Sequence, residues 1–178
     1  IEYNSGATGS SFNYNFLLDS NGVFWCTIFR AAWFYYHSWQ VDTRRPPVNS
    51  FWKAQLYIHA HSGYGDVLGD FSEDYRFVLA NRPTINIYKM EKNIDSETGE
   101  TKINKLKAAG IFSTTIHELT HAAHWGFDKE NYRNSPIIVY ETYARGIQRH
   151  LTSKVYSSID DEIEYYRLSY TGMMKDLT

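Results

Sequence analysis

The chain has 178 residues, with 18 Lys and Arg against 20 Asp and Glu, and 43% of it is hydrophobic. This length and balance predict one soluble globular domain rather than several. A formal charge of −2 excludes an electrostatic nucleic-acid binder, because clustered Lys and Arg bind the phosphate backbone. A single cysteine, Cys26, excludes a disulfide framework and a metal site of four thiolates.

The beginning of the chain predicts an exported protein. Residues 1–11 are mostly small and polar, like a linker, so we expect a linker-like tail followed by a single domain over residues 12–178. The first residue is Ile1 rather than Met, which indicates a processed or excised chain that is secreted or held at a cell surface. The lack of disulfide cysteines suits a bacterial source. The most apolar stretch, residues 23–36, is interrupted by Arg30 and is too short to span a membrane.

The first half of the chain predicts a helix followed by a small sheet. Asn21 can cap a helix that runs to about Trp39 and is apolar on two faces, so we expect it to be sandwiched between layers. An extended connection follows over residues 40–50. We expect strands at 52–60, 75–80 and 84–90, a loop at 61–74, and a solvated hairpin tip at 91–105.

Three more helices are predicted after the sheet. The first runs from about Ala108 to Trp125 and ends at Gly126, a residue suited to a helix C-terminus. The second is expected to open with Ser135 as its cap and Pro136 as its first helical residue, and to continue to about residue 155. The third starts after Ser158 and repeats apolar residues at helical spacing. The order of elements predicts an α+β fold.

The helix predicted from about Ala108 to Trp125 contains His117, Glu118 and His121 in the pattern HExxH. Residues four apart on a helix are neighbours, so the two imidazoles can bind one zinc ion. Glu118 is rotated about 100° around the helix, where it flanks the metal without competing for it. From there its carboxylate can take a proton from a zinc-activated water.

A third ligand is available in Glu141, twenty positions after His121. It lies in line with Ala144 and Gln148 on a helix face that is largely apolar. A carboxylate on such a face is costly unless it is paired or bound to metal. The alternative is an ion pair between Glu141 and Arg145 at a solvated edge.

These residues resemble the gluzincins, the thermolysin-like branch of the zincin metallopeptidases. The resemblance covers 25 residues of 178, from His117 to Glu141. It implies a zincin-like fold, with a small mixed sheet packed against an active-site helix and C-terminal helices. It also implies zinc ligands at His117, His121 and Glu141 and a general base at Glu118.

The chain also departs from known patterns. Gluzincins usually place an aspartate, which orients a zinc histidine, four residues after the ligand glutamate, whereas Arg145 stands there in this chain. The metzincin extension HExxHxxGxxH fails, because His124 replaces the glycine and Phe127 the last histidine. We expect His124, Arg145 and Tyr140 around the metal site or at the rim of its pocket.

Two further metal sites are weaker candidates. His59 and His61 share one strand face and could bind a second metal. Calcium could bind the acidic stretch of Asp66, Asp70, Glu73 and Asp74, although its spacing is not that of a dedicated calcium loop.

The sequence therefore predicts a zinc-dependent metallopeptidase with one zinc ion, a peptide or protein substrate, no nucleic-acid partner and no membrane span. Two alternatives stay open. One is a zincin-like module that binds a glycan or a protein, with a structural or latent zinc site, since aromatic residues make up 17% of the chain. The other is a zinc amidase that acts on a bond other than a peptide bond.

Overall fold

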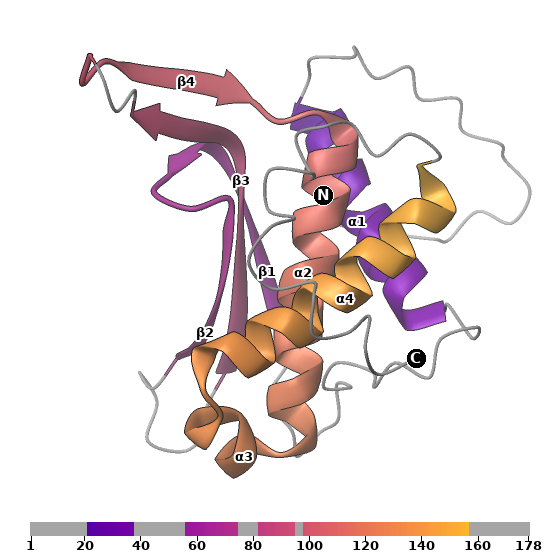
Figure 1. Ribbon diagram of the computed structural model, residues 1–178. Coiled ribbons are helices and arrows are strands. Elements are labelled where there is room, and N and C mark those ends of the chain that lie inside the picture. Colours follow the sequence, from indigo (N-terminus) through magenta and orange to yellow (C-terminus); the bar gives the residue numbers. More distant parts are fainter. Residues whose placement is uncertain (1–20, 38–55, 75–81, 95–97, 157–178) are drawn as a thin grey trace, which may run out of the picture.

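The computed structural model describes residues 21–37, 56–74, 82–94 and 98–156, and over these residues the fold is α+β (Figure 1). The described elements are four helices and a four-stranded sheet. In chain order they are α1 (Asn21–His37), β1 (Tyr57–Gly65), β2 (Gly69–Asp74), β3 (Arg82–Ile94), β4 (Thr101–Lys105), α2 (Ala108–Phe127), α3 (Lys129–Asn134) and α4 (Ile137–Val155).

The sheet is organised around β3, the longest strand. β1 pairs with β3 in parallel, and Ile58 stands opposite Ile85. On the other side, β2 pairs antiparallel with the first half of β3 and β4 with its second half. The strand expected at 84–90 is thus confirmed, but it lies inside the sheet. The edges of the described sheet are formed by β1, β2 and β4, since each of them pairs only with β3.

Helix α2 forms the centre of the molecule, between the sheet and α4 (Figure 1). Phe112, Ile116 and Leu119 of this helix are fully buried together with Ile85 and Ile87 of β3. Two buried threonines satisfy their hydroxyls locally, since Thr115 donates to the carbonyl of Ile111 and Thr120 to that of Ile116. This helix can therefore be buried around most of its circumference without orphaned hydroxyls.

Helix α1 buries only one of its two apolar faces fully. Phe24, Ile28, Ala31 and Tyr35 lie in the core as the pattern predicts. The expected second face is covered only in part, because Ala32 and Tyr36 pack against the core whereas Trp25 is 44% exposed. Apolar periodicity does not tell a covered face from an aromatic surface.

The region predicted as a loop at 61–74 is mostly strand. β1 continues to Gly65 because residues 61, 64 and 65 still pair with β3, and β2 begins at Gly69. Residues 91–94 of β3 pair antiparallel with residues 101–104 of β4, as expected for a hairpin. Gly99 has a φ of 70°, the left-handed conformation that glycine adopts without strain.

The boundaries of the later helices differ from the prediction. Asp128 is both the C-cap of α2 and the N-cap of α3. α2 continues through Gly126 and ends at Phe127, and the backbone N–H of Asp128 closes it on the carbonyl of His124. The Asp128 carboxylate then accepts from the backbone N–H of Asn131 and starts α3, a helix that the sequence analysis missed. Ser135 closes α3 rather than opening α4, because its hydroxyl donates to the carbonyl of Asn131.

Several expectations fall outside the described residues. These are the tail at 1–11, the connection at 40–50, the start of the strand at 52–60, the strand at 75–80 and the helix after Ser158. Within the described helices, none combines the length and apolar character needed to cross a lipid bilayer.

Candidate metal centre

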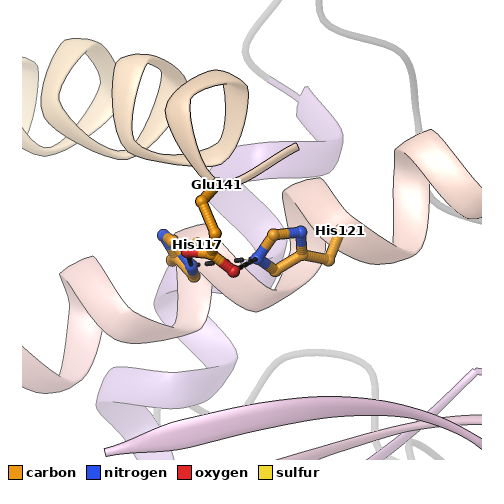
Figure 2. A group of neighbouring side chains, drawn as sticks. All are labelled: His117, His121 and Glu141. Carbon is orange, nitrogen blue, oxygen red and sulfur yellow. Dashed lines mark hydrogen bonds and ion pairs between the residues drawn. The ribbon is translucent and has the colours of Figure 1, made fainter. Parts of the chain in front are cut away.

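The side chains of His117, His121 and Glu141 meet between α2 and α4 (Figure 2). The two histidines lie one turn apart on α2, and their Nε2 atoms are 3.0 Å apart. The Glu141 carboxylate comes from α4, with one oxygen 3.2 Å from Nε2 of His117 and the other 3.2 Å from Nε2 of His121. The three residues that the sequence predicts as ligands are thus close enough to hold one metal ion.

The hydrogen on His117 is fixed by a residue that the sequence analysis did not select. The Nδ1 atom of His117 is 3.1 Å from Oε1 of Gln148. An amide oxygen only accepts hydrogen bonds, so Nδ1 carries the hydrogen. Nε2 of the neutral ring then directs a lone pair at the Glu141 carboxylate. Two acceptors at this distance need a cation between them, which is either an added proton or a metal ion.

His121 is held differently. Its side chain is 6% exposed, and burial lowers its pKa, although the nearby Glu141 carboxylate opposes that shift. Within the described part of the chain its Nδ1 atom has no hydrogen-bond partner. The ring packs edge-on against Tyr140, with centroids 5.5 Å apart, and against Tyr132 at 6.2 Å. On its Nδ1 side, packing rather than a hydrogen bond therefore orients this imidazole.

Glu141 stays ionised in this surrounding. Burial acts to raise its pKa, but the hydrogen bonds with His117 and His121 outweigh burial and hold the pKa well below its usual range. The alternative of a solvated ion pair at this position is not what the geometry favours, since the carboxylate faces the two imidazoles. A permanent negative charge is thus placed against two nitrogen ligands.

Glu118 lies beside this group and is buried, with 6% of its surface exposed. Burial raises its pKa to about 7, the electrostatic interaction with His117 opposes the shift, and the carboxylates of Glu141 and Asp70 add to it. A carboxyl group with such a pKa gains and loses a proton near neutral pH. Its position is suited to proton transfer.

The group opens into a cavity of about 600 Å³ between the sheet edge and the two helices. Both strand and helix residues line it: Asp66, Val67, Leu68, Gly69, Asp70, Phe71, Glu91, Lys92, Asn93, Thr114, His117, Glu118, His121, Tyr132, Tyr140, Glu141, Arg145 and Gln148. Tyr140 and Arg145 thus line the pocket as predicted. Tyr132 of α3 lines it too, and it was missed because α3 itself was missed.

His124 is not part of the group. Its ring lies edge-on to Tyr132 at 5.2 Å and to Tyr143 at 5.8 Å. The metal-binding group consists of His117, His121 and Glu141 without His124, and His124 does not line the cavity. One face of a helix advances too far in seven residues for a third imidazole to reach the same point.

Neither weaker candidate site gathers three metal-ligating side chains in the described residues. His59 and His61 have ring centroids 6.3 Å apart, and His61 contacts the Asn86 side chain instead of a metal-ligating group. Asp70 accepts from Asn86, and Glu73 forms an ion pair with Arg133. These acidic residues are therefore used in separate structural contacts, and the described part of the chain gathers no calcium site from them.

No protein-family model, curated protein or solved structure matches this chain. The site is therefore interpreted from its own residues. Among the residues that sequence reasoning missed, Gln148 had a signal, because it lies seven positions after Glu141 and so on the same helix face.

Proposed function

We propose that the chain is a zinc-dependent metallopeptidase of the zincin type. The observation that carries the proposal is the meeting of His117, His121 and Glu141 beside the buried carboxylate of Glu118 in one cavity. Two nitrogens and a carboxylate oxygen form a donor set typical of catalytic zinc. The α+β fold, with a small sheet against the helix that carries the motif, is compatible with it.

The spacing of the donor atoms supports a tetrahedral ion. Zinc bonds of about 2.0–2.1 Å separate two tetrahedral ligand atoms by about 3.3–3.4 Å. The separations here are 3.0 Å between the two imidazole nitrogens and 3.2 Å from each nitrogen to the carboxylate. The lone pairs directed at one another are the arrangement that a bound cation stabilises.

The opening of the group favours an enzyme over a structural zinc site. Structural zinc has four protein ligands, whereas catalytic zinc keeps one position open. The Glu141 side chain is 27% exposed, and all three residues line the cavity. His124, the residue best placed in sequence to close the site, lies outside the lining. These features count against the alternative of a binding module with a closed zinc site.

The chemistry follows from the residues around the cavity. A bound zinc ion would supply Lewis acidity, which makes water more acidic and polarises a carbonyl group. Glu118 takes the proton from the attacking water and returns it to the leaving amine. Burial raises the pKa of the Tyr132 hydroxyl and of the Tyr140 hydroxyl, so both stay protonated and can donate to the oxygen on which negative charge develops.

The test separates metal binding from turnover. Glu118→Gln should keep one zinc ion per chain and lose hydrolysis of a broad peptide library, because the amide cannot accept the proton. Glu91→Gln is the matched control, since Glu91 lines the same cavity but does not belong to the metal-binding group. Full turnover by Glu118→Gln would show that the mechanism is wrong. Cleavage of non-peptide amides alone would favour the amidase.

A further inference from the structure

Gln148 of α4 contacts two residues of α2 that lie one turn apart. Its Oε1 accepts from Nδ1 of His117 at 3.1 Å, and its Nε2 donates to Oγ of Ser113 at 2.7 Å. Ser113 and His117 are four residues apart and share one face of α2. A single amide therefore reaches the back of the His117 ring, on the side away from Glu141.

The contact with Ser113 anchors the donating end of the amide. An amide group has one accepting end and one donating end. Ser113 is buried, with 2% of its surface exposed, and its hydroxyl oxygen takes a hydrogen from Nε2. Oε1 is then directed at His117, so the Nδ1 hydrogen of that ring is fixed and Nε2 presents its lone pair to the candidate metal centre.

The Gln148 contact gives His117 a hydrogen-bond acceptor. In gluzincins an aspartate at the position of Arg145 usually orients a zinc histidine in this way. A metal-bound histidine usually donates its other ring N–H to a carboxylate, a carbonyl oxygen or a water, which fixes its tautomer and orientation. Gln148 is two helical turns after Glu141, so one face of α4 reaches both nitrogens of His117. His121 has no such contact in the described residues, which makes the Gln148 contact the principal hydrogen-bond support of the imidazole pair.

We propose that Gln148, held by Ser113, is a positioning residue that orients His117 for metal binding through a neutral amide. The inference rests on the metal centre of the proposed function. A carboxylate at this place would add negative charge and raise the basicity of the ring, whereas the amide fixes the ring without changing the charge of the site. Glu141 then remains the one anionic ligand.

Zinc affinity of the purified full chain tests this role without any measurement of activity. The zinc dissociation constant is measured by competition with a chromogenic chelator, and the visible spectrum of the Co²⁺-loaded chain reports the ligand geometry. Gln148→Leu should raise the constant about 10–100-fold and change the Co²⁺ spectrum. Gln148→Glu should bind zinc at least as tightly as the native chain, because its carboxylate accepts the same hydrogen bond.

Ser113→Ala provides an independent variant, and Ser153→Ala is its control. Ser153 lies on the exposed side of α4, where its hydroxyl contacts only the backbone carbonyl of His150 in the described structure. Ser113→Ala should raise the zinc dissociation constant several-fold, and Ser153→Ala should leave it unchanged. If Gln148→Leu does not fold, as judged by circular dichroism of the metal-free chain, the two serine variants decide.

The outcomes separate this inference from the proposed function. Equal zinc affinity of the native chain, Gln148→Leu and Ser113→Ala would overturn the positioning role, whether or not peptides are cleaved. If zinc binds tightly and this binding depends on Gln148, but no peptide is cleaved, the proposed peptidase function is wrong and the positioning role stands. A native chain that binds no zinc would overturn both.

Discussion

Gly69 allows the sheet edge to approach the proposed catalytic base closely, because glycine has no Cβ atom. A Cβ atom at this position would lie 2.7 Å from Cγ2 of Thr114, 3.1 Å from Cγ of Glu118 and 3.2 Å from the carbonyl oxygen of Asn86. Ordinary contacts of a Cβ atom begin at 3.4 Å. The extra methyl group of Gly69→Ala therefore forces β2 and α2 apart by several tenths of an ångström, at the wall of the cavity that carries Glu118.

The expected effect is moderate on stability and larger on turnover. Inserting a methyl group into a packed interface costs about 1–3 kcal/mol, which is about 2–12 °C in melting temperature for a chain of this size. A 1 Å misplacement of a catalytic group can cost about 100-fold in rate, so a shift of tenths of an ångström predicts about a tenfold loss of peptide hydrolysis. Zinc affinity should change little, because the three ligands lie on the α4 side of α2.

Thermal unfolding and peptide hydrolysis are measured on Gly69→Ala and on Gly63→Ala. A Cβ atom at Gly63 meets nothing within 4 Å, so this control makes the same change on the same sheet without a clash. It should be neutral or stabilising by up to about 1 kcal/mol, through the entropy of the unfolded chain. Thr114→Ser removes the methyl group that clashes, and combined with Gly69→Ala it should recover part of the stability and the rate. Equal melting temperatures for the two alanine variants would refute this reasoning.

Two further predictions concern the metal and the core. Glu141→Gln should raise the zinc dissociation constant, measured by chelator competition. The increase should exceed the roughly 10–100-fold expected for a residue that only supports a ligand. Unchanged zinc binding would show that Glu141 is not a ligand. The buried Tyr35 hydroxyl is expected to make the fold less stable at alkaline pH. Burial raises the pKa of this hydroxyl, a hydrogen bond with Thr120 opposes the shift, and Tyr143 and Tyr36 add to it. Above about pH 10 the unfolded chain loses this proton before the folded chain does, so stability present below pH 10 is lost as pH rises. Tyr35→Phe should show a weaker fall in melting temperature between pH 9 and 11, and an unchanged fall would contradict the prediction.

Local patterns were sufficient for the elements that pack by their own periodicity. The apolar spacing of α1, α2 and α4 and the pair Ile85 and Ile87 of β3 predicted segments that the structure confirms. In HExxH the helix itself places the two imidazoles side by side. These features depend on neighbours in sequence, so no knowledge of the rest of the fold was needed.

Features that depend on distant partners were missed or mistaken. Residues 61–65 contain glycine, serine and histidine and look like a loop, yet backbone pairing with β3 makes most of them strand. Asp128 caps a short helix that has no apolar periodicity of its own. Gln148 shares a helix face with Glu141 in the sequence, but only the crossing of α4 over α2 brings its amide to His117. Glu141 had a signal, a carboxylate on an apolar face, but its contact with the imidazoles is a tertiary fact.

The structure also explains how α2 tolerates an electrostatically costly site. One side of the helix places His117 and His121 against an ionised carboxylate, with Glu118 buried nearby, and such a group is unfavourable without a cation. The other side packs Ile116 and Leu119, both fully buried, against the sheet and α1. Because this apolar contact does not involve the ligands, it can hold the polar side chains in place whether or not a cation is bound. The geometry of the candidate metal centre is then a property of the folded core.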